Sequence, residues 1–140
     1  MTPAEIDALP AGPELDALVS EKVMGEMVTP AEGLVAGLVG ARTILRYEDN
    51  DIGGVFIKSW KPYPLPPYST DDAAALAIIK TGLGRGSGAS WRLSTACGLW
   101  FAEVGFWKPE PTFPLDVFGE GRGEMLALAI CRAALKAVKA

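Results

Sequence analysis

The chain has no histidine and only two cysteines among its 140 residues. Without histidine, the Ser-His-Asp and Cys-His catalytic groups are excluded, and most zinc sites lose a usual ligand. Cys97 and Cys131 lie in apolar stretches without a CxxC pair, so we expect two buried thiols rather than a disulfide or a metal site. These absences predict a protein that is not an enzyme and that carries no metal or other cofactor.

Long apolar runs and basic clusters are also missing. The longest apolar run, Met125 to Cys131, is far shorter than the roughly 20 residues of a membrane helix, and the N-terminus does not resemble a signal peptide. The net charge is −4, and an acidic protein without a basic cluster is a poor partner for duplex DNA. We expect a cytoplasmic protein that binds neither membranes nor duplex DNA, although its more basic second half could bind a small anion.

The residues that are present predict one compact domain over 1–140, because 49% of them are hydrophobic. Capping boxes beginning at Thr2 and Thr29, each followed by proline, predict two short helices. Ser69 or Thr70 is expected to cap another helix, which Gly82 ends. The three main helices are expected near 13–25, 70–81 and 122–138.

Two β-hairpins are expected between these helices. One spans 43–60 around an acidic, glycine-containing turn, and the other spans 89–107 with its turn near 96–98. The proline-rich segment 61–68 is expected to be an extended crossover outside any sheet. The fold class predicted is α+β, an α-β-α sandwich with a central antiparallel sheet built from the two hairpins and the three main helices. Because the strand 99–107 is apolar on both faces, helices or a partner chain must cover it, which predicts a homo-oligomer.

Four stretches carry a resemblance to a known family: PAGPELDALVSEKVMG (10–25), PPYSTDDAAALAII (66–79), the hairpin around Trp91 and Phe101, and LALAICRAALKAV (126–138). Together they resemble the phage ABA sandwich domain family, small proteins of bacteriophages and prophages. The resemblance covers about half of the chain and implies an α-β-α sandwich, but no activity and no catalytic residues. The chain departs from the family pattern in an insert at 29–60 and in the loop GLGRGSG, where a specialised function is to be sought.

The glycine-rich loop 82–88 suggests a ligand site. Successive glycine N–H groups can form an anion-binding nest, with an arginine as the counter-charge. Aromatic side chains nearby could stack on a planar base. The alternatives are a flexible linker for the loop, and core or subunit-interface packing for the aromatic residues. The ligand-binding residues predicted are Tyr68, Ser69, Thr70, Gly84, Arg85, Gly86, Trp91 and Arg92.

The geometry of this predicted site has one difficulty. A helix of about twelve residues places its ends about 18 Å apart, so Tyr68 and Arg85 meet only if the loop folds back or a second subunit contributes. The acidic segment Glu48–Asp51 is a second candidate, for a cation, but a solvated hairpin turn explains it as well.

Two functions remain open at this stage. The first is a non-enzymatic phage accessory protein that counteracts host defence by sequestering a small anionic nucleotide signal, such as a cyclic nucleotide. The alternative is a structural or protein–protein interaction module that acts through an apolar sheet face and has no small-molecule ligand. A hydrolase would need a metal site or a carboxylate pair, and the sequence locates neither.

Overall fold

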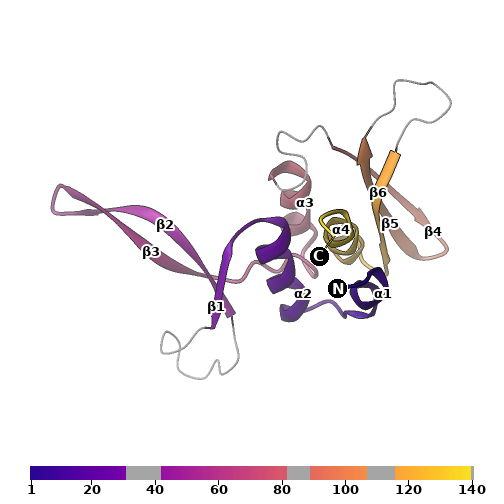
Figure 1. The fold of residues 1–140 in the computed structure, drawn as a ribbon, viewed down its shortest axis with the longest axis horizontal. Helices are drawn as coiled ribbons and strands as arrows, with labels where there is room; N and C mark the ends of the chain where they lie inside the picture. Colours follow the sequence, from indigo (N-terminus) through magenta and orange to yellow (C-terminus); the bar gives the residue numbers. More distant parts are fainter. Residues whose placement is uncertain (31–41, 82–88, 107–115, 140) are drawn as a thin grey trace.

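The computed structural model describes residues 1–30, 42–81, 89–106 and 116–139. Helices and strands are mixed, which confirms the α+β class (Figure 1). The helical elements are α1 (Pro3–Ala8), α2 (Pro13–Leu18), the π-helix η1 (Val19–Val23), α3 (Asp72–Thr81) and α4 (Leu126–Ala137). The strands are β1 (Met27–Pro30), β2 (Arg42–Ile52), β3 (Val55–Pro64), β4 (Ser90–Ala96), β5 (Leu99–Phe106) and β6 (Asp116–Gly123).

The strands form two antiparallel sheets, ordered β1-β2-β3 and β4-β5-β6. Both predicted hairpins are confirmed, but they lie in different sheets instead of forming one central sheet. Each hairpin gains a third strand that the sequence analysis did not predict, β1 in the first sheet and β6 in the second. The second sheet packs on α4 within the body of the molecule, whereas β2 and β3 project away from it (Figure 1).

Helix α4 is the centre of the core. It buries seven side chains, and residues from every other described helical segment pack around them. Its predicted start at residue 122 is wrong, because Arg122 and Gly123 still belong to β6 and the helix begins at Leu126. The buried α4 residues are Ala127, Ala129, Ile130, Cys131, Ala133, Ala134 and Leu135.

Alternating glycines allow α4 to lie directly against β6. A Cβ atom on Gly121 would come within 2.3 Å of the Ala129 carbonyl oxygen and within 2.4 Å of the Ala133 nitrogen. A Cβ atom on Gly119 would come within 2.5 Å of the Ala133 carbonyl oxygen. Since successive strand residues alternate between the two faces, glycine at every second position clears one whole face of β6 for the helix.

Short polar side chains start the helices. Thr2 and Glu5 form the predicted capping box of α1. For α3, the predicted cap at Ser69 or Thr70 is wrong, because the Asp71 carboxylate accepts the Ala73 N–H at 3.0 Å. Asp72 accepts the Ala127 N–H at 3.1 Å, so it satisfies a backbone donor at the start of α4, whose own cap residue Met125 forms no side-chain hydrogen bond.

The helix expected after Thr29 falls in residues 31–41, outside the described residues. Thr29 itself lies in β1, paired with Thr43 of β2. A further correction concerns the predicted crossover 61–68, because β3 continues to Pro64 and pairs with β2 up to that point. A proline lacks an N–H group, but an edge strand tolerates it where that group would face away from the neighbouring strand.

Candidate functional site

Strands β2 and β3 form a long two-stranded arm, which Figure 1 shows extending from the body. Gly53 and Gly54 close it with φ angles of 61° and 87°, the left-handed conformation that glycine adopts without strain. The Asp51 carboxylate accepts the Gly54 N–H at 2.9 Å. The acidic segment therefore contributes to the turn, as one of its two interpretations predicted.

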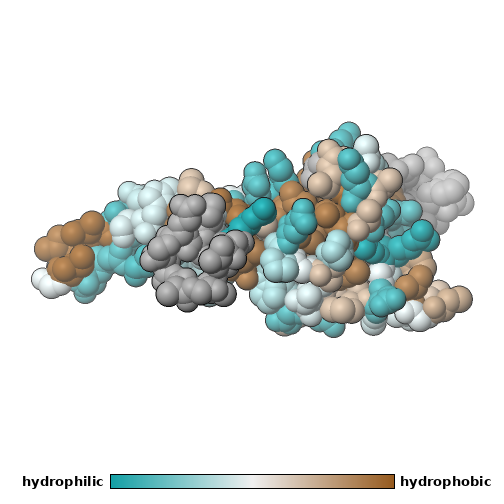
Figure 2. All heavy atoms as spheres, turned by 90° about the horizontal axis from the view of Figure 1, so that it is seen from below, coloured by the Kyte–Doolittle hydropathy of each residue, from teal (hydrophilic) through white to brown (hydrophobic). Residues whose placement is uncertain are grey.

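Six large apolar or aromatic side chains are exposed along this arm. Their exposed fractions range from 48% for Ile57 to 73% for Phe56. Figure 2 shows hydrophobic residues gathered at the far end of the arm, away from the body. We call this set the apolar arm surface: Tyr47, Ile52, Val55, Phe56, Ile57 and Trp60.

The stem of the arm carries an aromatic pair. Tyr47 and Trp60 lie opposite each other in the register, with ring centroids 5.1 Å apart. Such cross-strand pairs stabilise a two-stranded ribbon that receives little support from a core. Each ring of the pair is still about half exposed, so the pair can contribute to a contact with another molecule.

A polar network ties the base of the arm to the body. Glu26 accepts a hydrogen bond from the Tyr68 hydroxyl at 2.9 Å and one from Arg46 at 3.3 Å. The Arg46 guanidinium carbon lies 5.2 Å from the centroid of the Tyr63 ring, and the Tyr63 hydroxyl donates to Glu48. That bond raises the pKa of the Tyr63 phenol, so Tyr63 remains a protonated donor in the network.

Tyr68, a predicted ligand contact, belongs to this network and is buried. Burial, and then the bond to Glu26, raise the pKa of the Tyr68 phenol. Its aromatic ring packs in the core cluster. The described contacts therefore give Tyr68 a role in joining the arm to the core.

Ser69, the next predicted contact, is fully buried in a second polar cluster. Its N–H donates to Asp16 at 2.7 Å, and its hydroxyl oxygen accepts the Gly12 N–H at 2.8 Å. Burial raises the pKa of the Asp16 carboxyl, and the hydrogen bonds from Ser69 oppose that effect. This cluster fixes the start of α2 against the turn before α3.

The remaining described ligand candidates do not form a single pocket. Thr70 lines an opening of about 500 Å³ that is rich in carboxylates, with Asp71, Asp72 and Glu124 and no basic side chain among its described lining residues, so these residues do not favour an anion. Trp91 packs against the core cluster, and Arg92 forms an ion pair with Glu103. Gly84, Arg85 and Gly86 lie outside the described residues, and ligand binding by this set stays a prediction.

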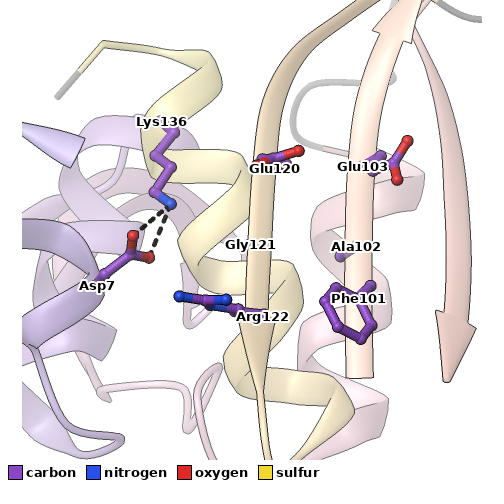
Figure 3. Close-up of a pocket in the computed structure, with 8 residues that line it drawn as sticks. All are labelled: Asp7, Phe101, Ala102, Glu103, Glu120, Gly121, Arg122 and Lys136. Atoms are coloured by element: carbon purple, nitrogen blue, oxygen red, sulfur yellow. Dashed lines mark hydrogen bonds and ion pairs between the residues drawn. The ribbon is translucent and has the colours of Figure 1, made fainter. Parts of the chain in front are cut away.

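Another pocket, of about 300 Å³, lies beside β6 (Figure 3). The Lys136 ammonium donates to Asp7 at 2.8 Å on one side of the strand, and β5 contributes side chains on the other. Three carboxylates and two basic groups line it, so its charge does not favour an anionic nucleotide. The lining residues are Asp7, Phe101, Ala102, Glu103, Glu120, Gly121, Arg122 and Lys136.

The two cysteines have opposite environments. Cys131 is buried as predicted, and burial raises the pKa of its thiol. The prediction that Cys97 is buried is wrong, because Cys97 and Gly98 form the turn between β4 and β5, and Cys97 is exposed with a φ of 53°. Within the described part of the chain, no three His, Cys, Asp or Glu side chains are grouped to hold a metal ion.

The sequence predicts the hairpin that carries the apolar arm surface, but its motifs do not single out that surface as a functional candidate. The available signal was the stretch Ile52–Ile57, in which large apolar residues flank two turn glycines. A hairpin tip normally carries polar residues because it lies far from the core. Large apolar side chains on both sides of such a turn are therefore unusual, and they mark the tip as a functional candidate.

A scan against protein-family models and searches of curated proteins and solved structures gave no match to this chain. The resemblance to the phage ABA sandwich domain family therefore remains a prediction from the four stretches quoted above. No helix in the described ranges is long and apolar enough to cross a bilayer.

Proposed function

We propose that the protein is a non-enzymatic interaction module that binds another protein molecule through the apolar arm surface. The observation that carries the proposal is the position of six large apolar side chains on an arm that projects from the body. A phage or prophage origin and a cytoplasmic location are kept as parts of the proposal, on the sequence resemblance and the two free thiols.

The size of the surface supports this function. With roughly 200 Å² for a large side chain, the six residues expose on the order of 700 Å² per chain at their observed fractions. The two faces of the ribbon share this area, with Tyr47, Phe56 and Trp60 on one face and Ile52, Val55 and Ile57 on the other. Each face therefore exposes about 350 Å², which lies within the roughly 300–600 Å² of the largest apolar patch on a typical monomer, and such patches are often functional. Exposure of this kind has a free-energy cost in water, which binding to another surface removes.

The carboxylate at the tip of the arm favours a protein over a membrane as the partner. Asp51 lies beside the turn, directly opposite Phe56 in the register, and Asp49, two residues before it, lies opposite Lys58. A carboxylate at the tip would have to enter the bilayer with the apolar side chains, and the negative surface of a membrane would repel it. A protein partner can instead provide donors for these carboxylates around an apolar contact.

Site-specific photo-cross-linking tests the proposal. Phe56 is replaced by p-benzoylphenylalanine, the full chain is irradiated in the cytoplasm of a bacterial host, and adducts are identified by mass spectrometry, with the chain itself counted as an allowed partner. The control carries the same group at Leu93, which is 36% exposed on the body. We expect one defined protein adduct from position 56 that position 93 does not give, and equal adducts from both positions would refute the proposal.

A further inference from the structure

The apolar arm surface lies next to a free backbone edge. Among the strands that the structure describes, the order β1-β2-β3 leaves β3 at the edge of its sheet, and β1 pairs only with the first four residues of β2. The outer part of β3 therefore presents both exposed apolar side chains and unpaired ladder positions. An exposed, hydrophobic edge strand is a template for pairing with another chain.

The turn determines which residues of β3 face this free edge. In a two-residue hairpin the flanking pair, here Ile52 and Val55, is hydrogen-bonded, and the pairs alternate from there. Phe56, Lys58 and Trp60 therefore direct their N–H and C=O groups away from β2. Pro62 is also even-numbered, so its backbone nitrogen faces the free edge. Because a proline nitrogen carries no hydrogen, the segment of β3 that can pair ends before Pro62.

The geometry points to a second copy of this chain as the partner that pairs with the free edge of β3. In this dimer the β3 strands of two arms are antiparallel, about a two-fold axis through Ile57. This inference rests on the proposed function and names its partner. Because the outward groups belong to even-numbered residues, even residues must pair with even residues across the new contact. The axis must then pass through a residue rather than between two residues.

Charge and proline select among the possible axes. An axis at Lys58 would place two lysines opposite each other, which is unfavourable. An axis at Ser59 would pair Phe56 with Pro62, which has no N–H to give. An axis at Ile57 places Phe56 opposite Lys58 of the partner subunit and brings the two Ile57 side chains together, so it avoids both problems.

The available area sets an upper limit for a dimer of this kind. The apolar arm surfaces of two chains amount to about 1,400 Å² in total, and pairing along β3 covers less than this because Tyr47 and Ile52 lie on β2. The contact is therefore at the low end of the roughly 1,200–2,000 Å² of a stable interface or below it, as in a weak dimer. A two-fold contact of this type is closed, because each chain uses the same strand to bind the other. We therefore expect a dimer rather than a filament.

Disulfide trapping tests the register. In the full chain with Cys97→Ser, the variant Ile57→Cys is oxidised with glutathione disulfide, and Val55→Cys is the matched control. At an axis through Ile57 the two residues 57 lie at a non-hydrogen-bonded pair about 4.5 Å apart between Cα atoms, which suits a disulfide. The two residues 55 are separated by four positions, or about 13 Å, which is too far.

We expect a disulfide-linked dimer from Ile57→Cys and at most a few per cent from Val55→Cys. Sedimentation of the parent chain is expected to give twice the chain mass of 14.8 kDa, and Ile57→Lys is expected to reduce it to one chain, whereas Leu93→Lys is not. Equal trapping at both positions overturns the register. A parent chain that is still monomeric at about 100 µM, a concentration roughly a hundred times a micromolar dissociation constant, overturns the inference.

Failure of this inference can be distinguished from failure of the proposed function. If the parent chain is monomeric but benzophenone at position 56 captures one defined other protein, the second copy is wrong and the interaction module stands. If the parent chain instead floats with vesicles of phosphatidylethanolamine and phosphatidylglycerol and the Ile57→Lys variant does not, the partner is a membrane. Both proposals, which name a protein partner, are then wrong.

Discussion

The two edge strands β6 and β3 differ in the size of their side chains. On β6, Gly119 and Gly121 leave out the side chain so that α4 can approach the sheet. On β3, Phe56 and Trp60 carry some of the largest side chains of the chain, yet the body leaves them exposed. The comparison shows that the contact between β6 and α4 depends on close approach of small residues, whereas the arm leaves large apolar side chains exposed.

Their local sequence explains why the strands differ. The helix that covers β6 carries alanine at positions 129, 133 and 137, one face of α4, so small residues meet small residues. Among the described elements, β2 and β3 have their main contacts with each other and with β1, and the ribbon is held by the cross-strand register and the aromatic pair Tyr47–Trp60. Substitutions that change volume should therefore affect stability in the body and association in the arm.

The largest effect is expected from Gly121→Val. Its Cβ would meet the backbone of α4 at 2.3 Å, and the helix backbone cannot yield as a flexible side chain would. We expect a loss of more than about 4 kcal/mol in the free energy of unfolding, measured by urea denaturation, which is exceptional for one substitution. Glu120→Ala, a neighbouring exposed residue on the other face, is the control and should change it by less than about 0.5 kcal/mol.

If Gly121→Val were tolerated, α4 would have to lie farther from β6 than the glycines indicate. The contrast between the two edge strands would then be one of composition only. A small loss for Gly121→Val, similar to that of the control, is therefore the result that contradicts this prediction.

A direct comparison of body and arm comes from Ile130→Ala and Phe56→Ala. Ile130 is fully buried in α4 and Phe56 is 73% exposed. We expect about 3 kcal/mol of lost stability for Ile130→Ala, because a buried side chain of this size leaves a cavity, and less than about 0.5 kcal/mol for Phe56→Ala. Urea denaturation at low protein concentration measures both.

The second half of that comparison is association. Sedimentation should show weaker self-association for Phe56→Ala and unchanged self-association for Ile130→Ala in the absence of denaturant. A similar loss of stability from both variants would mean that the arm is part of the core, and the contrast drawn above would be wrong.

The sequence predicted the α+β class and the hairpins because their signals are local. The pair Gly53–Gly54 between apolar runs specifies a tight turn, and a capping box specifies the start of α1. The separation of the hairpins into two sheets depends on which third strand each one finds. That choice depends on contacts between distant segments, which neither propensity nor periodicity records.

Strand β6 illustrates why the sequence does not predict the third strand of the second sheet. Three glycines in eight residues give it a low strand propensity, so the sequence predicts a helix that already begins at residue 122, within the strand. Its glycines alternate with period two and the facing alanines of α4 recur with period four, but this match can be recognised only once strand and helix are known to touch. Cys97 was misplaced for a related reason, since an apolar context does not bury a residue that lies in a two-residue turn.

For the candidate site, the sequence located the turn that holds Tyr68 and Ser69 but not the burial of these two side chains. Both were predicted to face a ligand, and both are buried in hydrogen-bonded clusters. A tyrosine or serine in a turn can be exposed or buried with the same local sequence. The outcome depends on Glu26 and Asp16, which are 42 and 53 residues away in the chain.

The smallest effect concerns Asp16, the buried carboxylate of the body, and it is visible mainly as a pH dependence. Burial raises the pKa of Asp16 above its usual value, so the folded chain holds this proton more tightly than the unfolded chain. The contribution of Asp16 to stability therefore falls as the pH rises from the unfolded pKa through the raised folded pKa. Asp16→Asn keeps an oxygen that can accept the Ser69 N–H but removes the charge. We expect its stability relative to the parent chain to improve from about pH 4 to about pH 7, by less than about 1 kcal/mol.

The control is Asp16→Ala, which leaves the buried Ser69 N–H without its acceptor and should cost about 1–3 kcal/mol at both pH values. Urea denaturation of the three chains at each pH measures the differences, so that other titrating groups cancel in the comparison. A stability difference between the asparagine variant and the parent that stays constant, or that moves against the asparagine variant as the pH rises, would show that burial does not penalise the charge of Asp16. The same pair of variants leaves the arm unchanged, so self-association should match that of the parent wherever the variants are folded.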